Sequence, residues 1–183
     1  MGFKITMKYL LITVLLITWQ FAPAQEWTAD SATVNFKIRN AGIAVKGTFD
    51  SLALSLKRSG NNWEDATLSG QVLAGSIDTG MGLRDKHLRK EDYFQVETYP
   101  WIRMESTDLK PAKKGILEGT FRLTIKEYTR ELPLVLTYTE SKDQIILETA
   151  FELDRRAFGL GGKSLILSDR VRVYVNAVLS NTQ

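Results

Sequence analysis

Apolar and polar residues alternate with a period of two along most of this 183-residue chain, and no other feature constrains the fold as strongly. In GILEGTFRLTIK, at 115–126, Leu117, Phe121 and Leu123 share one parity, whereas Arg122 and most other polar residues occupy the opposite parity. Side chains of a β-strand alternate between its two faces, so this pattern predicts a strand with one buried and one exposed face. Antiparallel sheets commonly carry this alternation because one of their faces is often solvated.

The same alternation recurs along the chain. Its apolar positions are Val34, Phe36 and Ile38; Leu52, Leu54 and Leu56; Leu132, Leu134, Leu136 and Tyr138; Ile145, Leu147, Phe151 and Leu153; and Val171, Val173, Val175, Ala177 and Leu179. Weaker segments at 44–49, 68–77 and 101–106 bring the total to about eight or nine strands, as in a sandwich or barrel. We favour an all-β barrel because closure leaves no exposed sheet edge.

One charged segment, MGLRDKHLRKEDYFQVETYP at 81–100, breaks the alternation. Its apolar residues fall at roughly helical spacings. Asp78 or Thr79 would serve as the N-cap, and Pro100 would end the segment before the next strand. We expect a short helical segment over about 80–95, lying across one end of the sheet.

The first 24 residues have the order of a secretory signal peptide. Two lysines precede an apolar run over 9–19, and Ala22-Pro23-Ala24 supplies the small residues of a cleavage site. A membrane anchor is the alternative, but a spanning helix needs about 20 apolar residues and this run is shorter. We therefore expect cleavage after Ala24, one mature domain over 25–183, and a periplasmic or secreted protein without stable membrane insertion.

Composition narrows the classes of partner. Cleavage lowers the formal net charge from +3 to +1, so the basic composition gives no reason to expect a nucleic-acid partner. The absence of cysteine excludes disulfides and thiolate metal sites, and a single histidine excludes a zinc site built from several histidines. We expect no metal and no cofactor. Whether the chain forms a homodimer is left open.

The segment AFGLGGKS at 157–164 has the spacing of a phosphate-binding P-loop if alanine is allowed at the first position. A P-loop requires a preceding buried strand and a following helix whose N-terminus faces the phosphates. The residues that follow, LILSDRVRVYVNAVLS, instead predict a turn and an alternating strand. We interpret the segment as a strand connection in which Gly159, Gly161 and Gly162 adopt positive φ, and expect no nucleotide ligand.

His87 is the only histidine, and it lies in a run of mixed charge between Arg84 and Asp92. Such a run is usually a solvated helix face with weak ion pairs, which is the favoured interpretation. A lid or gate for a ligand is the second interpretation. Acid–base catalysis by His87 with Asp85 or Glu91 is the third, and only their proximity supports it.

The charged segment, extended to SIDTGMGLRDKHLRKEDYFQVETYPWIRMES at 76–106, resembles the central motif of the YceI-like family of exported lipid-binding proteins. That motif has an Arg-Asp-x-His-Leu-Arg helix, an acidic-aromatic pair, and Tyr-Pro before a strand. Five further stretches agree in order: Trp27 with Asp30, VKGTFDSL at 45–52, LTIKEYTRELPLVL at 123–136, DRRAFGL at 154–160, and the strand from Val171. Two departures occur, because Ser31 follows Asp30 where the family usually has His-Ser, and Glu127-Tyr128 replaces a Gly-Val turn.

The resemblance implies a lipocalin-like, eight-stranded antiparallel β-barrel with a helix over it and an apolar cavity for a long polyisoprenoid or similar amphiphile. It implies a non-catalytic protein that sequesters or transports this lipid. Burial of hydrocarbon yields about 0.8 kcal/mol per CH₂ against an association cost of about 4–15 kcal/mol, so roughly ten or more carbons must be buried. The candidate ligand contacts are Phe36, Phe49, Ile102, Met104, Phe121, Leu123, Phe151 and Phe158 on the inward face, with Met81, His87 and Phe94 near the mouth. Ordinary core packing explains each of them at least as well.

Two other functions stay open. Period-two strands do not reveal whether the apolar face points inward or outward, so a small outer-membrane barrel would give the same pattern. The chain end SNTQ lacks the terminal aromatic residue of such barrels, which argues mildly against this alternative. A small barrel can also fill its interior with side chains, and the protein would then have a structural or stress-related role.

Overall fold

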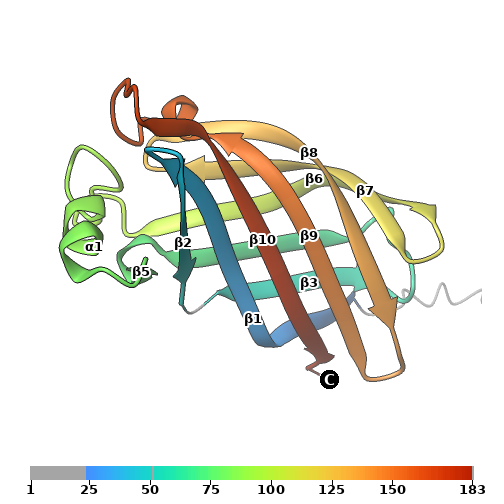
Figure 1. Cartoon of the computed structure of the whole chain (residues 1–183). Coiled ribbons are helices and arrows are strands. Elements are labelled where there is room, and N and C mark those ends of the chain that lie inside the picture. The colour runs from blue at the N-terminus through green and yellow to red at the C-terminus, as the bar shows by residue number, and fades with distance from the viewer. Residues whose placement is uncertain (1–23, 51, 183) are drawn as a thin grey trace, which may run out of the picture.

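The computed structural model describes residues 24–50 and 52–182, whose sheet closes into an antiparallel β-barrel (Figure 1). The eight strands of the closed wall lie in the order β1 (Ala24–Asn40), β3 (Ala53–Ser59), β4 (Thr67–Leu73), β6 (Trp101–Lys113), β7 (Ile116–Ile125), β8 (Tyr128–Glu140), β9 (Gln144–Asp154) and β10 (Leu167–Asn181). Pairing of β1 with β10, from Trp27 opposite Asn181 to Asn40 opposite Leu167, completes the closure. The predicted eight-stranded barrel is confirmed.

Two short strands complete the sheet at one end of the barrel. The first part of β1 pairs with β3, and its second part pairs with β2 (Ile43–Phe49). The outer edge of β2 in turn pairs with β5 (Ile77–Asp78). The segment expected as one strand over 68–77 is therefore divided into β4, a 3-10 turn η1 (Ala74–Ser76) and β5.

The apolar faces of the strands point into the barrel. In β7, Leu117, Phe121 and Leu123 are buried, whereas Glu118 and Arg122 are exposed. Charged side chains at outward positions are the reverse of the apolar band that a membrane barrel presents to lipid, so the alternation reflects an interior core. Within the described ranges, no helix combines the length and the hydropathy that a membrane crossing requires.

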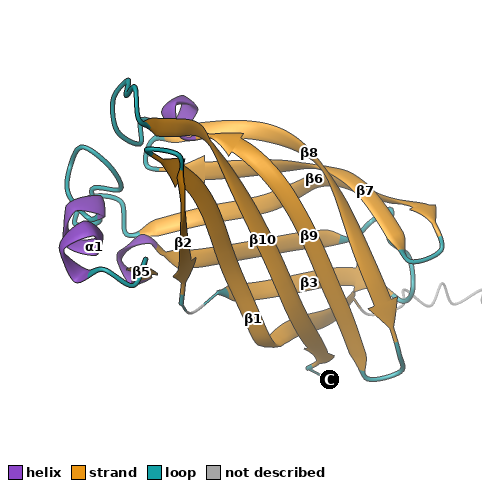
Figure 2. Cartoon of the chain, viewed as in Figure 1, coloured by secondary structure: helices purple, strands orange, loops and turns teal. Residues whose placement is uncertain are grey.

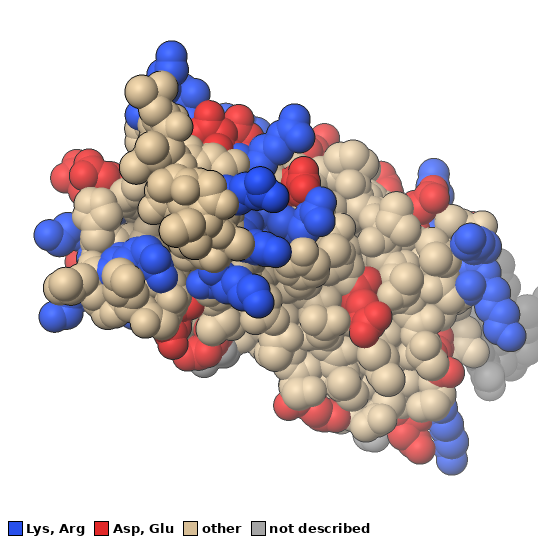
Figure 3. Space-filling model, in the orientation of Figure 1, with Lys and Arg blue, Asp and Glu red and all other residues tan. Residues whose placement is uncertain are grey.

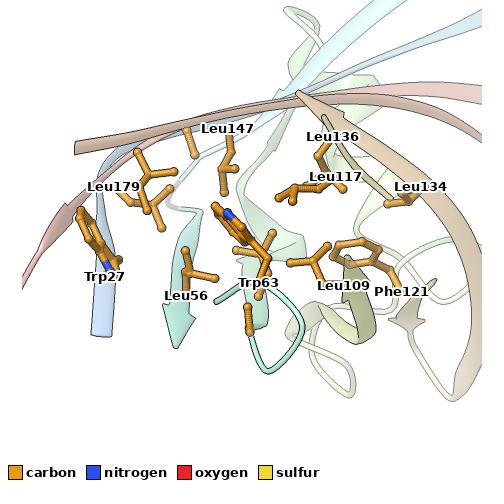
Figure 4. Packing of buried hydrophobic residues seen from close by; sticks show 14 residues of the cluster. Trp27, Leu56, Trp63, Leu109, Leu117, Phe121, Leu134, Leu136, Leu147 and Leu179 are labelled. Atoms are coloured by element: carbon orange, nitrogen blue, oxygen red, sulfur yellow. The ribbon is translucent and has the colours of Figure 1, made fainter. Parts of the chain in front are cut away.

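Large side chains fill the end of the barrel that carries the β6–β7 and β8–β9 hairpins. Figure 4 shows Trp63, on the loop between β3 and β4, pointing into a cluster that also contains Trp27, Leu56, Leu109 and Leu179. Packing at interior density leaves little room here. This end, which we call the closed end, therefore offers no path into the barrel.

Arg58 enters the closed end from β3 with its side chain fully buried. Its guanidinium lies 5.5 Å from the ring centroid of Trp27 and 4.6 Å from that of Trp63, and it forms a bidentate ion pair with Glu140. A buried charge is costly unless it is paired. The two rings and the carboxylate together make its burial tolerable.

The helical elements gather at the opposite end, which we call the mouth (Figure 2). The helix α1 (Gly82–Leu88) is shorter than the segment expected over 80–95, and the residues after it form turns before β6. The predicted N-cap at Asp78 or Thr79 is wrong. Gly80, with φ +72°, turns the chain so that the helix begins after Met81, and the Asp78 carboxylate instead accepts a hydrogen bond from the Gly80 amide.

The former P-loop candidate is a connection at the mouth between η2 (Arg155–Phe158) and β10. No helix follows it, in agreement with the interpretation as a strand connection. Gly159 and Gly161 have positive φ as expected, but Gly162 does not. The prediction for Gly162 is wrong because the chain there needs no left-handed turn.

Arg155 holds this connection in place. Its guanidinium is buried and donates to the carbonyl oxygens of Leu160 at 2.6 Å, Gly162 at 3.0 Å and Ser168 at 3.0 Å, and to Asp169 Oδ1 at 2.8 Å. These acceptors lie on both sides of the loop. One side chain therefore fixes the path of the whole segment beside the mouth.

We expect Arg155→Ala to lower the free energy of unfolding by about 3 kcal/mol, because the buried Leu160 carbonyl and the part-buried carbonyls of Gly162 and Ser168 lose their donor. Arg156 is the matched control, since it is half exposed and makes a single ion pair with Asp169 at 3.5 Å. Arg156→Ala should cost no more than about 1 kcal/mol. Urea unfolding of both variants measures the difference, and equal losses would contradict the role assigned to Arg155.

Gly119 supplies a second test, of the packing between β6 and β7. A Cβ at this position would lie 2.4 Å from the backbone oxygen of Asp108, beside an irregularity in the pairing of these strands. Gly119→Ala should therefore destabilise the protein by about 1–3 kcal/mol in thermal or urea unfolding. Gly162→Ala, where a Cβ meets no atom within 4 Å, should be close to neutral.

Candidate functional site

A cavity of about 420 Å³ occupies the barrel between the closed end and α1. Binding pockets for small molecules have volumes of roughly 300–1,000 Å³, so the space is large enough for part of an organic ligand. Its wall is mainly aliphatic and aromatic, and includes Val34, Phe36, Ile38, Val45, Phe49, Leu54, Val72, Ile102, Met104, Phe121, Leu123, Leu134, Phe151, Leu153, Val171, Val173 and Val175. A cavity with such a wall favours hydrocarbon over polar solutes.

Small inward residues keep this half of the barrel open. Three valines of β10, at 171, 173 and 175, face the cavity, whereas tryptophan and leucine side chains fill the closed end. On β2, a Cβ at Gly47 would lie 2.3 Å from the Phe36 ring, so this ring lies against the strand. The same alternation thus produces a filled core at one end, and at the other a cavity whose wall combines valines with phenylalanines.

The mouth adds polar groups to the wall. Arg84 of α1 donates from Nε to Thr79 Oγ1 and from Nη2 to the Thr79 carbonyl, both at 2.7 Å. His87 lines the cavity beside Tyr93, whose ring it meets edge to face at 5.1 Å between centroids. The cavity is therefore lined by cationic and aromatic groups where it approaches α1.

The contacts of His87 with its neighbours do not match those expected for acid–base catalysis. Asp85 is buried, and its Oδ1 accepts hydrogen bonds from the amide and hydroxyl of Thr79. Residues two apart on a helix do not face each other. In the part of the chain that the structure describes, no hydrogen bond or ion pair joins His87 to Asp85 or Glu91.

Asn40 is a wall residue that the sequence interpretation missed. It ends β1 at the mouth, and its Oδ1 is buried without a hydrogen-bond partner among the described residues. Its parity is that of Val34, Phe36 and Ile38, so a polar residue on an apolar face was the available signal. An unpaired buried acceptor can bind a hydroxyl or other donor of a ligand.

The structure brings nine of the eleven candidate ligand contacts to the cavity wall. These are Phe36, Phe49, His87, Phe94, Ile102, Met104, Phe121, Leu123 and Phe151. The other two lie outside the wall: Phe158 is buried in the core beside η2, and Met81 is exposed to solvent. That the nine contact a ligand stays a prediction.

Three groups with displaced pKa values lie outside the cavity wall. A backbone hydrogen bond lowers the pKa of the Glu127 carboxyl, and the charge of Glu127 raises the pKa of the Tyr99 phenol. A hydrogen bond to Glu152 raises the pKa of Arg172. Over 24–50 and 52–182, no group of three or more His, Cys, Asp or Glu residues could hold a metal ion.

Curated relatives are similar to a large part of this chain. A UPF0312 protein of Photorhabdus laumondii is 30% identical over 139 residues, which cover 73% of this chain and 70% of that protein. The protein YceI of Salmonella arizonae is 31% identical over 126 residues, or 66% of this chain and 65% of its own length. A UPF0312 protein of Ectopseudomonas mendocina is 31% identical over 61% of this chain, and the match spans 60% of that relative.

Solved structures show the same fold. BcnA of Burkholderia cenocepacia has a TM-score of 0.75 at 19% identity, covering 80% of this chain and 95% of its own. A polyisoprenoid binding domain from Saccharophagus degradans has a TM-score of 0.71 at 13% identity, covering 85% of this chain and 98% of that domain. The family described as YceI-like domain matches residues 26–179. The chain, with its closed barrel, helix at the mouth and apolar cavity, therefore belongs to the YceI-like family.

Proposed function

We propose that this protein binds a long-chain polyisoprenoid or similar amphiphile in the barrel cavity and sequesters or transports it. The observation that carries the proposal is the cavity of about 420 Å³ with its mainly apolar wall. The barrel from Saccharophagus degradans, described as polyisoprenoid binding, supports the same class of ligand. Because that similarity lies at 13% identity, the support for an apolar ligand comes mainly from the cavity itself.

The shape of the cavity suggests how such a ligand would lie. The closed end is filled by Trp27 and Trp63, so a hydrocarbon chain would enter from the mouth and end against this cluster. A polar end group would remain near the mouth, where Asn40, Arg84 and His87 line the wall. This orientation leaves polar groups near water and buries carbon, which is the arrangement of lowest free energy.

We propose that the protein acts without catalysis. The cavity offers hydrocarbon contacts, and Asp85, the nearest candidate partner of His87 in sequence, is engaged by Thr79. A general base requires a hydrogen-bonded path to the reacting proton and commonly a group that orients it. The role that fits His87 is contact with the ligand or closure of the mouth.

A bulky residue in the cavity tests the proposal. Val173→Trp would place an indole in the space that the lipid chain needs, and should weaken retention of a radiolabelled long-chain polyprenol by at least about tenfold. Asn176→Trp, exposed on the outer face of the same strand, is the matched control and should retain the lipid. Gel filtration of the protein with the labelled polyprenol measures both. Equal retention by wild type and Val173→Trp would contradict binding inside the barrel.

We also propose that the protein is exported and functions in the periplasm or outside the cell. The support is the order of residues 1–24, which resembles a signal peptide and lies, apart from Ala24, outside the described residues. Intact-mass measurement of the protein from the periplasmic or secreted fraction should give the mass of residues 25–183. Recovery of the full-length chain from the cytoplasm alone would contradict this proposal.

A further inference from the structure

The mouth exposes an unusual concentration of large apolar side chains. Leu165 is 99% exposed and Leu83 is 81% exposed, and Ile43, Ile166 and Met81 are also exposed. We call these five residues the mouth patch. Leu73, at the end of β4, is 39% exposed, and the other exposed large apolar side chains of the described residues are Val135 and Ile146 on the barrel wall. A hydrogen bond joins the hairpin that carries Ile43 to the loop that carries Leu165 and Ile166, and adjoining apolar residues mark an interaction surface more often than apolar residues scattered singly.

On one side of the mouth, hydrogen bonds fix the β1–β2 hairpin and the loop before β10, which carry part of the mouth patch. Ala41 at the tip of the β1–β2 hairpin donates to the Ile166 carbonyl at 2.8 Å, which joins the hairpin to the loop before β10. Ser164 Oγ accepts from the amides of Ile166 and Leu167, and Arg155 binds the carbonyl groups of the same loop. These hydrogen bonds order the loop, so its apolar side chains are held in exposed positions.

Cations lie directly behind this apolar tip. Lys37, Arg39 and Lys46 are exposed on the outer face of the β1–β2 hairpin. In Figure 3, basic side chains lie at the top of a projection at the upper left and below it to the right, and acidic side chains lie beside it. Lys37 stands directly opposite Lys46 on one side and Arg172 on the other. Like charges opposite each other destabilise a sheet. Arg172 is paired with Glu152, but none of the ion pairs in the described chain involves Lys37 or Lys46, so these two lysines lack an acidic partner.

The spacing of the two groups matches the layers of a bilayer surface. Lys37 and Lys46 lie three residues from Asn40 and Ile43, the last paired residues of the hairpin, or about 10 Å along the strands. Interfacial segments bury apolar residues about 5–10 Å into a membrane, and cations at that distance would meet the phosphate layer. Both features occur at the end where the cavity reaches the surface.

From these observations we propose that the mouth patch docks on the surface of a bilayer that contains anionic lipid. The cavity mouth then faces the membrane, and lipid passes between bilayer and barrel without crossing water. This inference rests on the proposed lipid-carrier function and adds the surface through which loading occurs. The occupant is a lipid surface because apolar tips and unpaired cations fit its acyl and phosphate layers together.

Vesicle flotation of the purified full-length mature protein tests the proposal. Wild type should bind vesicles of phosphatidylcholine with phosphatidylglycerol at least roughly tenfold more tightly than vesicles of phosphatidylcholine alone. The double variant Leu165→Asp with Ile166→Asp, and the double variant Lys37→Glu with Lys46→Glu, should each bind the anionic vesicles roughly tenfold more weakly than wild type. Val135→Asp with Ile146→Asp is the matched control, because it adds the same charges to exposed apolar positions on the barrel wall.

Three results would overturn docking: no binding of wild type to either vesicle, equal binding to both, or equal losses in the mouth and wall variants. Native mass spectrometry after loading with long-chain polyprenol in detergent separates this inference from the proposed function. The mouth variants should hold the lipid in detergent and fail to extract it from vesicles. If neither wild type nor the variants hold polyprenol in detergent, the proposed lipid-binding function is wrong. Docking on the membrane is tested separately by vesicle flotation.

Discussion

The pairing of β1 with β10 is the constraint on which the barrel and its cavity depend. It joins strands from the two ends of the described chain, and irregularities near Ala29 and Ile38 adjust the pairing along its length. Without it, the sheet would have two open edges, and the inward faces of the strands would not enclose a common space. A cavity in a small barrel exists only once the wall is closed, so the binding space depends on contacts between residues far apart in sequence.

Two buried arginines organise the two ends of this barrel differently. At the closed end, Arg58 lies among aromatic rings and pairs with Glu140, so the core there is filled and fixed. At the mouth, Arg155 binds backbone carbonyl groups and shapes a loop without filling the space beside it. Arg155 meets several acceptors, whereas Arg58 meets one carboxylate and two rings and its Nε has no hydrogen-bond partner among the described residues. Because a buried charge is costly without such partners, each arginine is specific to one arrangement of its surroundings.

The two ends of the barrel differ in packing: one end is filled by side chains and the other encloses the cavity. Tryptophan and leucine fill one half, while the other half encloses a cavity whose wall combines valines with phenylalanines. The open half ends at the mouth, where exposed apolar residues lie near cations on β1 and β2. The two proposals would therefore place lipid storage and membrane contact in adjacent parts of the molecule.

The sequence alone indicated most of the strands, the apolar face of each and the family, because alternation and the motif at 76–106 are local patterns. It did not show that the apolar faces point into the barrel. It placed most candidate contacts on the correct face but could not give their depth, so Phe158 lies in the core outside the cavity wall. Tertiary structure alone decided which half of the barrel stays open and where the buried polar groups find partners. Arg58 meets Glu140 82 residues away, whereas the buried Oδ1 of Asn40 has no hydrogen-bond partner in the described chain. Such pairings depend on closure of the barrel, which brings together residues that no local pattern relates.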